Sequence, residues 1–177
     1  TEQVNGVWQG ACYPFREGLS TGILNVQFTP LGRLLCGGTN RGWPVRGIKP
    51  FALERLEWTG KMPFEIKSIN ITGNGFKITF TKPLDQRTGG NIKNYKIAAF
   101  THNYHAGYGG PEVDLNNPVV ESVELAAGGR SAIIVLSEVK RGYVHEFDLV
   151  ALRERRHELV VIDAAAAVGV ARLHSYS

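Results

Sequence analysis

The sequence predicts an all-β protein, and three of its features support this class. Short stretches of alternating apolar and polar residues recur with turns between them, at a spacing of roughly 8–12 residues that is typical of antiparallel sandwiches. Glycine accounts for 21 of the 177 residues, a surplus that frequent turns explain. No segment of useful length before residue 150 shows the helical period of about 3.6. We therefore expect antiparallel strands joined by turns.

The first strands are expected within residues 1–62. Residues 24–28 alternate, residues 29–32 (TPLG) are a turn signal, and residues 33–37 are again mainly apolar. An apolar run on each side of a turn predicts a β-hairpin. Further along, residues 51–58 alternate with a change of parity, which predicts a bulge near Glu54.

Longer strands are expected from residue 63 onward. We place them at residues 65–72, 76–80, 95–100, 119–125, 132–136 and 144–149. The first two flank a glycine-rich hairpin signal, and Ile66 is out of step with the other isoleucines of its strand. The order of strand, glycine hairpin, apolar strand, polar turn and strand occurs twice. We therefore predict an immunoglobulin- or fibronectin-like antiparallel β-sandwich over residues 63–155, followed by an irregular tail over residues 156–177.

The charge and the apolar runs limit the classes of partner. The net charge of +4 is scattered, and its densest spots, at Lys140-Arg141 and around Arg155, lack the interleaved aromatics of a nucleic-acid platform. Nucleic acid is not expected as a partner. No apolar run reaches the length of about 18 residues that a membrane span needs. The chain starts at Thr1 without an initiator methionine or a signal peptide, from which we expect a piece of a larger protein.

Two cysteines leave two possibilities open. Cys12 and Cys36 are too few for a disulfide framework and too widely spaced for a zinc knuckle. They either form one bridge or remain two separate thiols.

Residues 101–114 (THNYHAGYGGPEVD) are the first place to look for recognition. Their glycines and proline predict a shaped loop, which we expect to be exposed and to join the two halves of the sandwich. His102 and His105, with His145, are candidate ligands of a copper or zinc ion, since imidazole suits both metals. The alternative is that these imidazoles hydrogen-bond the loop backbone.

Aromatic side chains suggest a second kind of site. Tyr104 and Tyr108 are candidates for stacking on a carbohydrate, with packed tyrosines as the alternative. Arg41 and Trp43 either line a ligand-binding face or tie neighbouring loops together. No catalytic residue is predicted: the chain has no Gly-x-Ser-x-Gly motif, and no phosphate-binding loop is complete.

Five segments together resemble one protein family. They are residues 13–18 (YPFREG), 37–43 (GGTNRGW), 56–65 (LEWTGKMPFE), 75–85 (GFKITFTKPLD) and 104–114 (YHAGYGGPEVD). These are similar to the C-terminal part of large secreted bacterial propeller proteins, often labelled sorbosone-dehydrogenase-like or membrane-bound-dehydrogenase-like. The resemblance covers residues 6–150, and the tail departs from the usual ending of the family.

The resemblance implies a domain order and a function. Residues 1–62 would be an end-of-propeller blade segment and residues 63–155 the appended sandwich, in a secreted or periplasmic protein. The chain would be a non-catalytic accessory module that packs against the rest of its own propeller and binds carbohydrate or a surface. An alternative is a quinone-dependent sugar or aldehyde dehydrogenase whose pyrroloquinoline quinone (PQQ), calcium and active site lie in other blades. A further alternative is a mononuclear metal-binding module.

Overall fold

The computed structural model describes residues 1–13, 15–41, 45–149, 151–154, 161–164, 169–170 and 172–174. The chain is all-β with several antiparallel sheets, which confirms the predicted class. Within the described residues, helix is confined to one turn, α1 (Gln86–Gly89), and a 3₁₀ turn, η1 (Ile92–Asn94). The chain divides into two compact units. We call Thr1–Pro14 with Met62–Ser177 the two-sheet unit, and Phe15–Lys61 the three-stranded unit.

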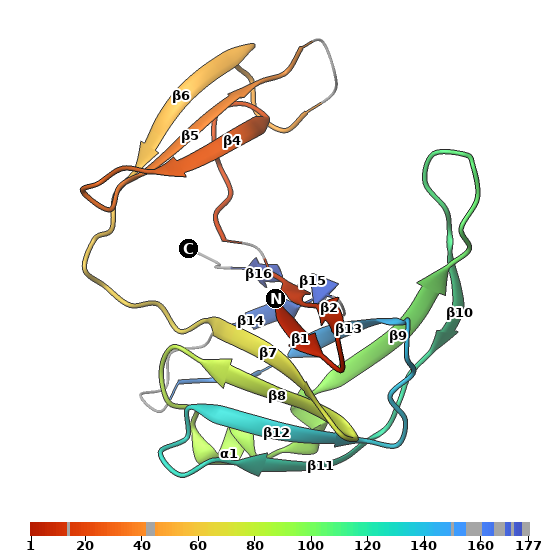
Figure 1. The fold of residues 1–177 in the computed structure, drawn as a ribbon. Coiled ribbons are helices and arrows are strands. Elements are labelled where there is room, and N and C mark those ends of the chain that lie inside the picture. The colour runs from red at the N-terminus through yellow and green to blue at the C-terminus, as the bar shows by residue number, and fades with distance from the viewer. Residues whose placement is uncertain are drawn as a thin grey trace. The chain divides into compact units, whose positions relative to one another are not determined.

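The first sheet of the two-sheet unit has four strands. They are β7 (Ile66–Thr72), β8 (Gly75–Phe80), β11 (Val120–Leu125) and β12 (Ser131–Leu136). Their order is β11-β12-β8-β7, as Figure 1 shows. Both expected hairpins, β7–β8 and β11–β12, are present. The β7–β8 register shifts between Ile66 and Ser68, so the out-of-step Ile66 turns inward and is buried.

The second sheet has five strands. They are β9 (Lys96–His102), β10 (Glu112–Asn116), β13 (Val144–Leu149), β14 (Val161–Ala164) and β16 (Arg172–His174). The sheet order is β10-β9-β13-β14-β16. We expected an irregular tail, but β14 pairs with β13. Pairing with a distant strand gives this segment a structure that its own weak pattern does not reveal.

The core lies between these two sheets. Ile78, Phe80 and Ile134 from the four-stranded sheet belong to one buried cluster with Phe147 and Leu149 from the five-stranded sheet. These side chains alternate with more exposed ones along each strand, as strands with one covered face require. The Phe76 and Phe147 rings meet edge to face, with centroids 5.0 Å apart.

The N-terminal residues belong to the two-sheet unit. β1 (Glu2–Val4) and β2 (Val7–Gln9) form a hairpin, and β3 (Ala11–Cys12) pairs in parallel with β15 (Gly169–Val170). The Glu2 carboxylate accepts hydrogen bonds from Ile71 N and from Asn70 Nδ2, both at 2.9 Å. We expected residues 1–62 to form one segment; instead, these contacts join residues 1–13 to β7, while a unit boundary lies at Met62.

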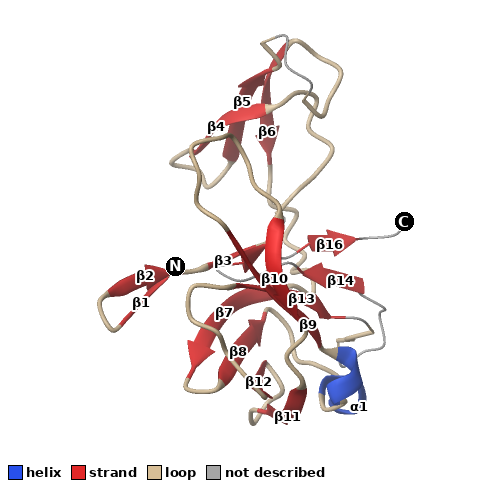
Figure 2. Cartoon of the chain, turned by 90° about the vertical axis from the view of Figure 1, so that its right-hand side faces the viewer, coloured by secondary structure: helices blue, strands red, loops and turns tan. Residues whose placement is uncertain are grey.

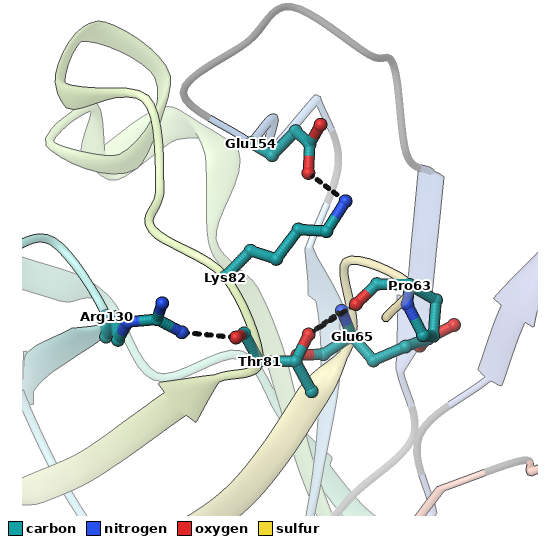
Figure 3. A network of polar contacts seen from close by, with 6 residues as sticks. All are labelled: Pro63, Glu65, Thr81, Lys82, Arg130 and Glu154. Carbon is teal, nitrogen blue, oxygen red and sulfur yellow. Dashed lines mark hydrogen bonds and ion pairs between the residues drawn. The ribbon is translucent and has the colours of Figure 1, made fainter. Parts of the chain in front are cut away.

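Figure 3 shows a polar network within the two-sheet unit. Lys82 Nζ lies 2.6 Å from the Glu154 carboxylate, which is buried. Thr81 Oγ1 donates to the Pro63 carbonyl at 2.6 Å, and Arg130 donates to the Thr81 carbonyl. The Leu84–Glu154 bridge and the ion pair from Lys82 to Glu154 tie the segment after β13 to the segment between β8 and α1. Nearby, the Asp85 side chain caps α1 by accepting from Thr88 N.

The three-stranded unit is an antiparallel sheet of β4 (Ile23–Phe28), β5 (Leu34–Thr39) and β6 (Phe51–Leu56), in that order. The predicted β4–β5 hairpin is present, and the turn closes with Gly32 N donating to Thr29 O. The register shift lies in β4, between Ile23 and Asn25, and β6 pairs regularly past Glu54. The bulge near Glu54 was therefore predicted in the wrong strand. Glu54 instead points to Ser20, whose N and Oγ donate to it.

Candidate functional site

The loop rich in histidine and tyrosine is the tip of a hairpin. β9 and β10, on either side of it, pair antiparallel in the same sheet, with Glu112 opposite His102. Figure 1 shows the two strands running side by side to the loop. We expected the loop to join the two halves of the sandwich. That part of the prediction is wrong, because the chain passes between the sheets after β10, on its way to β11.

The two imidazoles of the loop contact its own backbone. His102 Nδ1 lies 3.1 Å from the Pro111 carbonyl oxygen, and His105 Nδ1 accepts from Gly107 N at 3.1 Å. A Cβ atom at Gly110 would lie 3.0 Å from His105 Nε2, so glycine leaves the room that this ring occupies. These contacts shape the loop in the way the backbone-binding alternative requires.

His145 is in a different environment from the two imidazoles of the loop. It sits on β13 opposite Ala99, is 4% exposed, and packs its ring against Phe76 with centroids 5.1 Å apart. Burial lowers its pKa, although a hydrogen bond to the Tyr143 backbone opposes this. Across the described part of the chain, no three His, Cys, Asp or Glu side chains are grouped to hold a metal ion. The metal site at His102, His105 and His145 stays a prediction.

Both loop tyrosines project into solvent. Tyr104 is 104% exposed and Tyr108 109%, so neither ring packs against the protein. Their rings are therefore open on both faces. Arg41 is also exposed, with a positive φ of 46° and its backbone N donating to Thr39 Oγ1 at 3.3 Å. Trp43 lies outside the described residues.

A polar cluster at the base of this hairpin was missed by sequence reasoning. The β9–β10 register shifts between Val113 and Asn116, where Asp114 adopts a φ of +54°. Its carboxylate accepts a hydrogen bond from Tyr143 and lies 3.8 Å from Lys140 Nζ. Lys140 in turn lies over the Tyr143 ring, 5.0 Å from its centroid. The bond to Asp114 raises the pKa of Tyr143. Nothing in the sequence marks Asp114 as a bulge residue.

A cavity in the two-sheet unit was also missed. It has a volume of about 440 Å³ and lies beneath the β1–β2 hairpin, which Figure 2 shows at the side of the unit. Its lining combines residues of that hairpin with Ile71 and Thr72 of β7, Phe76 of β8 and His145 of β13. The cavity is formed by the β1–β2 hairpin, β7, β8 and β13, which are distant in sequence. No local sequence motif could therefore predict it.

Comparison with protein-family models, with curated proteins and with solved structures finds no match. The resemblance to propeller proteins therefore rests on the sequence motifs alone. Within the described residues, no helix is long and apolar enough to cross a membrane. Both cysteines are free thiols, Cys12 exposed and Cys36 buried.

Proposed function

We propose that this chain is a non-catalytic packing and binding module of a larger secreted β-propeller protein. In this proposal the three-stranded unit is part of a propeller blade and the two-sheet unit is an immunoglobulin-like sandwich. The observation that carries the proposal is the amount of apolar side chain that the three-stranded unit leaves exposed.

The three-stranded unit has almost no core of its own. Among its described residues, 15–41 and 45–61, Thr21 and Cys36 alone are buried. Its exposed large apolar residues are Phe15, Ile23, Leu24, Val26, Phe28, Leu31, Val45, Ile48, Phe51, Leu53 and Trp58. A small sheet needs a covered apolar face for stability, and apolar side chains concentrated in this way mark a surface that another surface covers.

Both faces of this sheet carry apolar groups. Phe51 and Leu53 of β6 are 75% and 74% exposed, and Leu53 lies opposite Gly37 of the central strand. We call Phe51, Leu53 and Gly37 the Phe51 face. On the other face, Val26 and Phe28 are 56% and 69% exposed. Sheets that stack on both sides, as propeller blades do, need apolar side chains on both faces. The partner is therefore a further β-sheet on each side, from the rest of the same propeller.

The Phe51 face supplies the test of this proposal. The double variant Phe51→Lys/Leu53→Lys should lower the fluorescence of a bound hydrophobic dye and shift the chain toward monomer in light scattering at high concentration. The matched control is Leu115→Lys/Val119→Lys, which changes two exposed aliphatic residues of the two-sheet unit. Equal effects from the two double variants, or none from the first, would count against a covered face.

A second proposed role is carbohydrate or surface binding at the hairpin tip. The full exposure of Tyr104 and Tyr108 favours it, because sugar rings stack on accessible aromatic faces. In a glycan-array screen, Tyr104→Ala and Tyr108→Ala should each weaken any binding about tenfold. Tyr143→Phe, which keeps its ring, is the control. Binding that survives both alanine variants argues against these residues.

The enzymatic alternative places the chemistry in other blades. If the larger protein oxidises a sugar with PQQ and calcium, its gene encodes the rest of the propeller in the same reading frame as this chain. The test is reconstitution of that full-length protein with PQQ and Ca²⁺. Reduction of a dye that depends on added sugar supports the dehydrogenase. No reduction supports the non-catalytic packing module.

A further inference from the structure

The cavity beneath the β1–β2 hairpin has mainly apolar walls. Val4 and Val7 line it from the hairpin, Ile71 from β7, Phe76 from β8 and Phe147 from β13. Its volume of about 440 Å³ lies within the range of roughly 300–1,000 Å³ that small-molecule sites occupy. Such sites combine an apolar lining with a few polar groups that orient the ligand.

Two polar atoms of the lining residues are buried without a hydrogen-bond partner among the described residues. They are Nε2 of His145 and Oγ1 of Thr72. A buried polar atom without a partner is destabilising, so such atoms are rare and call for a reason. Both residues line the cavity, so a polar group of a ligand there would supply the missing partner once a small side-chain movement uncovers these atoms.

The protonation of His145 defines which polar group fits. The imidazole is 4% exposed, and burial favours its neutral form. Its hydrogen bond to the Tyr143 backbone favours the protonated state of the bonded nitrogen, as expected where the ring N–H donates to a carbonyl oxygen. In a neutral ring whose other nitrogen carries the proton, Nε2 is a bare acceptor. The ligand must therefore donate a hydrogen bond.

The charged side chains at the cavity, one carboxylate and two cations, do not select a charged ligand. Glu2 also lines it. Although burial opposes ionisation, hydrogen bonds from Ile71 N, Asn70 and Gln9 lower the pKa of Glu2. The carboxylate is therefore ionised at neutral pH and disfavours a second negative charge. Of the two cations at the lining, Lys140 is paired with Asp114, and Arg141 balances the Glu2 carboxylate in charge, so the lining has no excess charge for an ion to match.

We propose that this cavity is a binding site for a small, neutral, mainly apolar molecule with one hydroxyl group, such as a phenol or a medium-chain alcohol. The hydroxyl donates its hydrogen to Nε2 of His145, and the hydroxyl of Thr72, which also lines the cavity, is the second polar group that can bond it. The apolar body lies among the valine, isoleucine and phenylalanine side chains. The site is independent of the packing role of the three-stranded unit.

The test compares two probes that differ by one hydroxyl group, para-propylphenol and propylbenzene. Titration of the full chain, followed by NMR, should move the signals of Ile71, Phe76 and His145, with a Kd about tenfold lower for the phenol. The ¹⁵N signal of His145 Nε2 should shift with the phenol alone, because only the phenol donates to it.

Substitutions test whether the preference for the phenol depends on His145 and Thr72. His145→Phe and Thr72→Val should each reduce the preference for the phenol, and His145→Phe should abolish it. His102→Phe, at an exposed imidazole of the same sheet, should leave it unchanged. Equal Kd values for the two probes in the unmodified chain, no binding of either probe, or shifts that map to another surface would each overturn the proposal. The comparison of probes on the unmodified chain stands even if His145→Phe does not fold.

Discussion

The two units use similar sequence patterns with opposite results for their apolar side chains. In the two-sheet unit, Ile78 of the alternating strand β8 and Leu84, which follows that strand, are fully buried in a cluster that draws on both sheets. In the three-stranded unit, Leu53 occupies a regular strand position and is 74% exposed. Alternation thus predicts a strand in both units, but it does not reveal whether a second layer covers the apolar face. The difference teaches that the two-sheet unit supplies its own second layer, whereas the described residues of the three-stranded unit form a single layer, which is why we propose a covering sheet.

The largest expected effect is the difference in stability loss between Leu84→Ala and Leu53→Ala. Leu84→Ala should lower the free energy of unfolding by about 2–5 kcal/mol, because it leaves a cavity in a packed core. Leu53→Ala should change it by less than about 0.5 kcal/mol, because its side chain is mostly in water already. Urea denaturation measures both. Similar losses for the two variants would mean that the exposed leucine has a covering layer within the chain.

The next effect concerns ion pairs that differ in burial. Lys82→Met should destabilise the two-sheet unit by about 2 kcal/mol, since it leaves the buried Glu154 carboxylate without its partner. The effect stays below that of a fully buried pair because Lys82 is 31% exposed. Lys96→Met, at a pair 3.8 Å apart with both partners exposed, is the control and should cost less than about 1 kcal/mol. If both variants lower the free energy of unfolding equally, the ion pair between Lys82 and Glu154 in Figure 3 does not stabilise the two-sheet unit.

Glu65 makes the two-sheet unit sensitive to pH. Burial raises the pKa of Glu65 to about 7, and its Oε2 has no partner within the described structure. The folded state therefore binds more protons than the unfolded state between pH 4.5 and 7, so stability falls as pH rises through this window. Partial solvent screening reduces the effect to about 1 kcal/mol.

The corresponding variant is Glu65→Gln. It should stabilise the chain by about 1 kcal/mol at pH 8 and leave the stability at pH 4 nearly unchanged, because the amide resembles the protonated acid. Denaturation midpoints at the two pH values measure this. A gain at pH 4 as large as the gain at pH 8 would show that ionisation is not the cause.

The smallest effect is expected at the hairpin tip. Tyr104→Ala and Tyr108→Ala should each change stability by less than about 0.5 kcal/mol, because their rings contact solvent only. Thermal unfolding is the measurement. A larger loss would show that the tyrosines pack within the protein and are not free for a ligand.

The strands and turns could be predicted because their signals are local. The glycine at position 75 after the β7–β8 turn and the glycines between β11 and β12 mark hairpins within a few residues of the strands that they join. The misplaced bulge at Glu54 shows the limit of this approach, since a change of parity is a weak sign of register. The error stays within one sheet, since the observed register shift lies in β4 and the predicted one in β6.

The site features could not be predicted, because they depend on long-range pairing. The binding of Glu2 to β7 joins residues that are 69 positions apart, and no periodicity encodes that contact. The burial of His145 follows from Phe76 on another sheet. The exposure of Tyr104 and Tyr108 was left open by composition, since tyrosine is common both in cores and at surfaces.

Hydrogen exchange followed by mass spectrometry tests the central claim most directly, because it reports the stability of both units in one sample. If the three-stranded unit lacks its covering layers, the amides of β4, β5 and β6 should exchange orders of magnitude faster than those of β8 and β12, which should exchange only through global unfolding. Equal protection of the two sets of strands would contradict the account, since it would show that the three-stranded unit is stable without a partner.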